Sequence, residues 1–194
     1  MKKKSLISVL LLMVLLVCLS GCNSTPKETP TESSVKEVSE SNQTNTGKRV
    51  YLAGPLFSQA EREYNLKISE ILESYGYDVF LPQRDGVLAT ELVGLTGEEK
   101  VAKIFEIDKN EVLKSDIVFV ILDGRVPDEG ACIELGLGYA YGKRCYGFKS
   151  DFRSIESDID INPMIAGCLQ KIFYNVDGEK LLEDLKTYLD NNQL

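Results

Sequence analysis

The sequence predicts an α/β domain built as a doubly wound parallel sheet of about five strands with helices on both faces. Two observations lead to this prediction. Short apolar segments alternate along residues 48–194 with longer segments that begin with helix-start signals. The segment 117–122 reads Ile-Val-Phe-Val-Ile-Leu, and such an uninterrupted apolar run is typical of a central parallel strand buried on both faces.

The predicted strands are short and end at turn residues. Gly54 and Pro55 end the first strand, and Pro82 ends the second, which is followed by a polar loop over 83–95. In chain order, the strands are expected at 50–53, 77–81, 117–122, 144–148 and 171–174.

Four helices are predicted from capping signals and apolar spacing. Capping boxes at Ser58-Gln59-Ala60-Glu61 and Thr96-Gly97-Glu98-Glu99 open the first two helices, and Gly76 closes the first. The second helix should carry near one face Val101, Ile104, Phe105, Asp108 and Val112. In chain order, the helices are expected at about 59–75, 97–114, 130–141 and 178–191.

The composition excludes several classes of chemistry. The 194 residues include no His, so a Ser-His-Asp triad, a Cys-His pair and a His-ligated zinc site are all ruled out. The formal net charge of −8 argues against a surface that follows nucleic-acid phosphates. Catalysis in this chain must therefore use carboxylates, Tyr, Lys, Cys or backbone groups.

The N-terminus resembles a bacterial lipoprotein signal. Lys2 to Lys4 form a basic start, and Leu6 to Leu19 is a 14-residue uncharged stretch with the length of a signal h-region. The tetrapeptide Leu19-Ser20-Gly21-Cys22 resembles the lipobox, whose Cys is diacylated and becomes the new N-terminus. An ordinary signal peptide or a plain membrane anchor is the alternative. The prediction is a signal over 1–21 and an extracytoplasmic protein lipid-anchored to the bacterial cell membrane through Cys22.

The segment that follows the lipidated Cys is predicted to be a disordered linker. Over 22–47 it is rich in Ser, Thr, Glu, Asn and Pro, and its large aliphatic residues are only Val35 and Val38. Such a composition cannot bury enough surface to offset the entropy of ordering. The folded domain is therefore expected at 48–194.

Acidic residues mark the candidate site, because ligands in such sheets bind beyond the C-terminal ends of the strands. Glu134 follows Asp128 by six residues, near the start of a predicted helix and among small or apolar residues. Asp108 lies on the apolar face of the preceding helix. Converging carboxylates supply a nucleophile and a proton donor for glycosidic chemistry. Alternatively, Asp128 is only an N-cap residue and Glu134 points to solvent.

Other residues have ordinary structural interpretations. Tyr51 on the first strand is more often a core residue, although its phenol could reach a carboxylate at a neighbouring helix start. Gly136 and Gly138 look loosely like a dinucleotide loop but follow no strand, so they are expected to permit close helix packing. Cys132 and Cys145 are expected to be buried thiols, and one disulfide among Cys132, Cys145 and Cys168 is possible. No cofactor and no metal site are predicted.

Three segments together resemble the nucleoside 2-deoxyribosyltransferase family. The resemblance covers about 49–165 and rests on Tyr51-Leu52-Ala53-Gly54-Pro55-Leu56-Phe57, on Asp108 and Asp116, and on Asp128-Glu129-Gly130 with Glu134-Leu135-Gly136-x-Gly138-Tyr139-Ala140. It implies a flavodoxin-like fold, an oligomer, and transfer of a 2-deoxyribosyl group between nucleobases by double displacement. No cofactor is implied, and the partners would be a nucleoside, a free nucleobase and further copies of the chain.

The resemblance also implies roles for individual residues. Glu134 would be the nucleophile, Tyr51 would orient it, and Asp108 and Asp128 would contact the base and handle its proton. Binding roles fall on Gln83, which would hold the base, on Gly54 and Phe57, which would line the pocket, and on Asn162 and Met164, which would reach a neighbouring subunit's site.

Two other functions use the same residues. The chain could be a nucleoside or nucleoside 5′-monophosphate N-glycosidase, if water reaches the intermediate as well as a base does. It could also be a non-catalytic surface lipoprotein that binds nucleosides. Arg84, Lys149 and Arg153 could serve a phosphate, but each is expected to be an ordinary surface residue.

Overall fold

The computed structural model describes residues 45–153 and 159–194. The predicted signal peptide, Cys22 and nearly all of the predicted linker lie outside these ranges. Within them, no helix is both long enough and apolar enough to cross a membrane.

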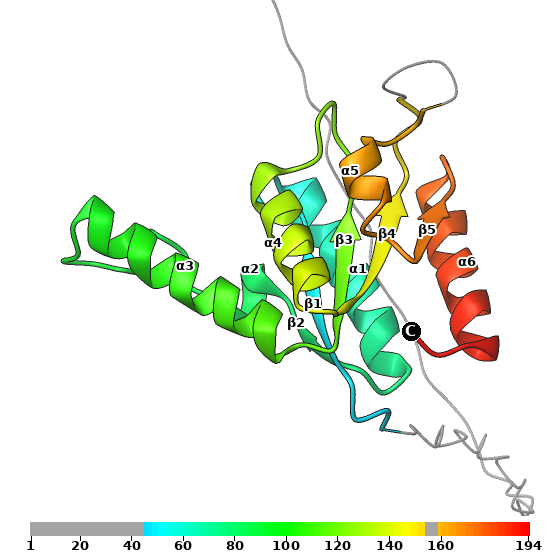
Figure 1. Cartoon of the computed structure of the whole chain (residues 1–194), viewed down its shortest axis with the longest axis horizontal. Coiled ribbons are helices and arrows are strands. Elements are labelled where there is room, and N and C mark those ends of the chain that lie inside the picture. The colour runs from blue at the N-terminus through cyan, green and yellow to red at the C-terminus, as the bar shows by residue number, and fades with distance from the viewer. Residues whose placement is uncertain (1–44, 154–158) are drawn as a thin grey trace, which may run out of the picture. The chain divides into compact units, whose positions relative to one another are not determined.

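A single parallel sheet forms the centre of the described part (Figure 1). Its strand order, β2-β1-β3-β4-β5, is the flavodoxin-like order of a doubly wound sheet, as predicted. The observed strand bounds agree with the predicted ones to within about two residues. The strands are β1 (Arg49–Ala53), β2 (Asp78–Phe80), β3 (Ile117–Ile121), β4 (Arg144–Lys149) and β5 (Lys171–Tyr174).

The four predicted helices are present, and both predicted capping boxes form at Ser58 and Thr96. Two helices of four residues were not predicted: α2 lies at the start of the segment expected to be a loop, and α5 follows Asn162. Both begin with proline, which is favoured in the first turn of a helix. The helices are α1 (Gln59–Ser74), α2 (Pro82–Asp85), α3 (Gly97–Lys114), α4 (Glu129–Ala140), α5 (Pro163–Ala166) and α6 (Gly178–Asn191).

Alternate residues of β1 point into two separate cores. Val50 and Leu52 join the core that the sheet forms with α1 and α6. Tyr51 and Ala53 join the core on the opposite face, where α4 packs. The period of two along the strand therefore places Tyr51 beneath α4.

Close packing of α4 requires a glycine at position 138. A Cβ atom there would lie 2.5 Å from Cγ2 of Val118 on β3. At Gly136, by contrast, a Cβ atom would meet nothing within 4 Å. The predicted packing role therefore holds for Gly138 and not for Gly136.

Helix α3 extends away from the rest of the domain (Figure 1). Val112, near its C-terminal end, is the one residue of this helix that is buried. Val101 and Phe105 were expected on a packed face, but they are 70% and 55% exposed. The prediction was wrong for these two residues because only the last turns of α3 lie against the sheet.

Candidate functional site

A hydrogen bond between Tyr51 and Glu134 joins β1 to α4. Tyr51 is completely buried, and its ring stacks on Phe80 of the neighbouring strand with 5.5 Å between the ring centroids. Its hydroxyl donates to Oε1 of Glu134, in the second turn of α4, over 2.7 Å. The structure thus contains the contact that was expected between a phenol on the first strand and a carboxylate near a helix start.

Burial dominates the ionisation of this pair. It raises the pKa of Glu134 to about 7; the hydrogen bond from Tyr51 opposes that rise, and the negative charges of Asp108 and Asp128 add to it. Burial, followed by the charges of Glu134 and Asp108, raises the pKa of Tyr51 far above its usual value. Tyr51 therefore remains a hydrogen-bond donor at any physiological pH.

Asp108 supplies the second acidic group. It lies on α3, about two turns before the C-terminal end of the helix, which packs on the sheet. Its charge acts on both Tyr51 and Glu134. Burial raises the pKa of Asp108 to about 6, so this carboxyl is protonated in a fraction of the molecules near neutral pH. A group of this kind can donate a proton.

Asp128 is the N-cap residue of α4. Its Oδ1 accepts a hydrogen bond from the backbone N–H of Ala131 over 2.9 Å. The capping interpretation is therefore correct, and it is compatible with a role in the site, because the charge of Asp128 also raises the pKa of Glu134. The charges of Asp108 and Asp128 thus both act on Glu134, and those of Glu134 and Asp108 both act on Tyr51.

The proposed pocket-lining residues Gly54 and Phe57 lie in the turn after β1, and the proposed base-binding residue Gln83 lies in α2, which follows β2. The amide of Gln83 is held inside the chain: its Oε1 accepts from Asn65 Nδ2 over 2.9 Å, and its Nε2 donates to the Arg62 carbonyl over 2.8 Å. A Cβ atom on Gly54 would lie 3.0 Å from the side chain of Ile121, so the β1 turn approaches β3 closely. Phe57 is exposed.

Asn162 and Met164 lie outside the cluster around Glu134. Asn162 caps α5 by accepting from the backbone N–H of Met164 over 2.9 Å, and the side chain of Met164 is exposed. Asn162 lines an open cavity of about 830 Å³ beside α4, together with Val126 and Ile133. Neither Tyr51 nor Glu134 lines this cavity.

The three basic residues considered for a phosphate are engaged elsewhere. Arg84 pairs with Glu73 at 2.8 Å and with Asp85 at 2.9 Å, and Arg153 pairs with Asp151. Lys149 was expected at the surface, but it is 4% exposed. As the last residue of β4 it turns inward, and its Nζ donates to the backbone carbonyl of Arg153 over 3.0 Å.

The described residues contain no group of three or more His, Cys, Asp or Glu side chains that could hold a metal ion. Cys132, Cys145 and Cys168 are free thiols, and Cys145 is buried in the core next to α4. The buried position of Cys145 agrees with the prediction, whereas Cys132, also predicted to be buried, is only partly buried.

Comparison with known proteins gives one family. The family model described as nucleoside 2-deoxyribosyltransferase matches residues 50–190. No protein with a curated description matches the sequence.

Solved structures of similar fold include both a 2-deoxyribosyltransferase and an N-glycosidase. The 2-deoxyribosyltransferase from Bacillus psychrosaccharolyticus is 26% identical, with 72% of this chain and 91% of that chain covered and a TM-score of 0.59. A conserved protein from Enterococcus faecalis V583 is also 26% identical, with 72% and 98% covered and a TM-score of 0.58. The CMP N-glycosidase of Clostridium botulinum shares the fold at 17% identity, with 73% and 99% covered and a TM-score of 0.50. The chain therefore belongs to the nucleoside 2-deoxyribosyltransferase family.

Proposed function

We propose that this protein transfers a 2-deoxyribosyl group from one nucleobase to another by double displacement, with Glu134 as the nucleophile. The observation that carries the proposal is the buried hydrogen bond from Tyr51 to Glu134, with the further carboxylates of Asp108 and Asp128 around it. A retaining exchange at an anomeric carbon needs one carboxylate to attack and one acid to protonate the leaving group.

The two half-reactions follow from this arrangement. Tyr51 holds Oε1 of Glu134, so Oε2 attacks the anomeric carbon while the bond to the base nitrogen breaks. Asp108 or Asp128 donates a proton to the departing base. A second base then attacks the glycosyl-enzyme, its proton passes to the same acid, and the carboxylate of Glu134 is released.

The two raised pKa values set a common pH range for the reaction. Glu134 must be ionised to attack, which favours pH values at or above its pKa of about 7. The proton donor must be protonated to assist, which for Asp108 favours pH values at or below about 6. No pH satisfies both conditions fully, so only a minority of molecules carries an ionised Glu134 together with a protonated Asp108, and that fraction is largest between these two values.

The substrate would be a nucleoside, with a free nucleobase as acceptor.

The active form would be a homo-oligomer whose sites are shared between subunits. Asn162 lines an open cavity with the exposed apolar side chains of Val126 and Ile133, and the nearby Met164 on α5 is also exposed. Clustered exposed apolar residues of this kind are typical of protein interfaces. In this arrangement Asn162 and Met164 complete the site of a neighbouring subunit.

A product assay on the full chain tests the activity directly. Incubation with a 2′-deoxynucleoside and a second base should yield a new nucleoside only when that base is present. Glu134→Gln should lower the rate by roughly 10³-fold or more, because the amide cannot form the ester. Glu183→Gln, on α6 at the opposite face of the sheet, should leave the rate unchanged. Free base and sugar without an acceptor, or no turnover with purine and pyrimidine substrates, would contradict the proposal.

Tyr51→Phe tests the orientation of the nucleophile. The variant keeps the stacked ring and loses only the hydrogen bond to the charged form of Glu134. We expect the pKa of Glu134 to rise, so that fewer molecules carry the ionised nucleophile and kcat/KM below about pH 7 falls, and kcat to fall by roughly ten-fold or more. Tyr64→Phe is the matched control, since the Tyr64 hydroxyl bonds to the Gly178 carbonyl over 2.8 Å on the other face of the sheet. An unchanged kcat/KM below about pH 7 in Tyr51→Phe would count against the orienting role.

Mixing two inactive variants tests the shared site. Glu134→Gln and Asn162→Ala, unfolded together and refolded, should regain up to about a quarter of the wild-type activity, because a mixed pair of subunits contains one intact site. If Asn162 acts within its own subunit, every site keeps one defect and no activity returns.

For the N-terminus we propose lipidation of Cys22 and an extracytoplasmic location. In bacteria that express the full chain, Cys22→Ser should move the protein out of the lipid-modified membrane fraction, while Cys18→Ser should not. Fractionation and the mass of the mature N-terminus measure this, and an unlipidated wild-type chain would refute it.

A further inference from the structure

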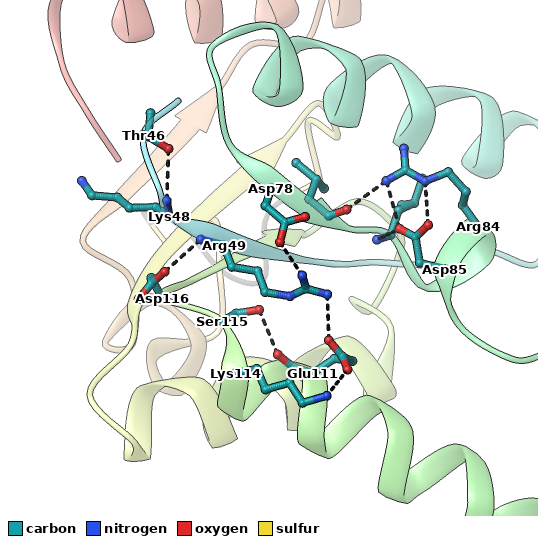
Figure 2. Close-up of polar contacts among 12 residues, drawn as sticks. Thr46, Lys48, Arg49, Asp78, Arg84, Asp85, Glu111, Lys114, Ser115 and Asp116 are labelled. Carbon is teal, nitrogen blue, oxygen red and sulfur yellow. Dashed lines mark hydrogen bonds and ion pairs between the residues drawn. The ribbon is translucent and has the colours of Figure 1, made fainter. Parts of the chain in front are cut away.

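Arg49, at the start of β1, joins three parts of the chain outside the site (Figure 2). Its Nη2 donates to Oε2 of Glu111 on α3 over 2.9 Å, and its Nη1 pairs with Asp78 on β2. Its backbone N–H donates to Oδ2 of Asp116 over 2.8 Å, at the junction between α3 and β3. One residue therefore ties the C-terminal end of α3 to the sheet by both its backbone and its side chain.

The pair of Arg49 and Glu111 is well shielded. The Glu111 side chain is 14% exposed and the Arg49 side chain 32%, so water screens this ion pair less than a surface pair. Burial alone would raise the pKa of Glu111, but Lys114 and Arg49 hold it below its usual value. Glu111 is therefore ionised over the whole working pH range.

The Arg49 side chain has one unfavourable feature. Among the described residues, Nε of Arg49 is buried and has no hydrogen-bond partner. A buried polar atom without a partner costs folding free energy, and such an atom in a native structure calls for another explanation.

Glu111 and the site residue Asp108 share one face of α3. They are three residues apart, which places them one above the other on the helix surface. The charges of both act on Tyr51. Elsewhere α3 packs mainly against α4, Val112 is its one buried residue, and its N-terminal part extends away from the domain (Figure 1). The position of Asp108 thus depends on the contacts that α3 makes with α4, with the sheet and through Arg49.

Arg49 also lies near the aromatic ring on which Tyr51 stacks. Its guanidinium lies 5.8 Å from the centroid of the Phe80 ring, and Phe80 stacks on Tyr51. A shift of Arg49 would therefore disturb both the helix that carries Asp108 and the ring on which Tyr51 rests.

We propose that Arg49 and Glu111 are a positioning pair, which holds α3 so that Asp108 stays against Tyr51 and Glu134. Neither residue contacts the substrate. This inference rests on the proposed function for its kinetic consequence, but the position of Asp108 can be measured without turnover.

Glu111→Gln in the full chain tests the proposal, because it keeps the shape of the side chain and removes its charge. With α3 less firmly held, Asp108 becomes more hydrated, and its pKa should fall from about 6 toward the ordinary value for Asp. Titration of ¹³C-labelled Asp carboxyls by NMR measures this directly. Fewer molecules then carry the protonated acid, so kcat/KM above about pH 6 should fall, and kcat should fall by roughly ten-fold.

Two further variants separate positioning from simple stabilisation. Glu106→Gln removes an ion pair with Lys109 (2.6 Å) that stays within α3, so it should change neither the Asp108 titration nor the pH profile. Arg49→Lys keeps the charge without the forked geometry and should recover part of what Arg49→Met loses. If Glu111→Gln does not fold, as judged by near-UV circular dichroism, the Arg49→Lys and Arg49→Met comparison carries the test.

An Asp108 titration and a pH profile that are unchanged in a folded Glu111→Gln variant would overturn the proposal. So would equal effects of Glu111→Gln and Glu106→Gln. If the wild-type chain turns over no nucleoside, the proposed function fails, and the NMR titration still decides whether the pair positions Asp108.

Discussion

The close approach of α4 to the sheet is the constraint on which the candidate site depends. Gly138 allows it, because any side chain there would meet Val118. Glu134 lies one turn earlier on the same face of the helix, so the distance that the glycine sets is also the distance at which Glu134 meets Tyr51. The close packing at Gly138 therefore also sets the position of the Glu134 carboxylate.

Two carboxylates one turn apart on α3 behave in opposite ways, and their surroundings explain the difference. Burial raises the pKa of Asp108, whereas Lys114 and Arg49 hold that of Glu111 below its usual value despite burial. The same helix face thus carries a group that can hold a proton and, beside it, a group that keeps its charge. Sequence alone gives these residues the same chemistry, and only the neighbours distinguish them.

The sequence predicted the elements whose signals are local. Alternation and capping boxes located every strand and the four longer helices, whereas α2 and α5 were missed because each is a single turn beginning with proline. The predictions that Phe105 packs on a buried face and that Lys149 lies at the surface were wrong, because both depend on how far an element lies from the sheet. Arg49 was not singled out, because its side-chain partners are 29 and 62 residues away in the chain.

The alternation of β1 has a consequence for how defects in this protein must be interpreted. Neighbouring residues of the strand enter different cores, with Val50 and Leu52 on one side and Tyr51 and Ala53 on the other. A single inserted or deleted residue would exchange the two sets, exposing the phenol to α1 and α6 and presenting an aliphatic side chain to Glu134. The same alternation of side chains along the five residues of β1 supplies both cores and the contact with Glu134. A shift by one residue would therefore disrupt the packing and the candidate site together.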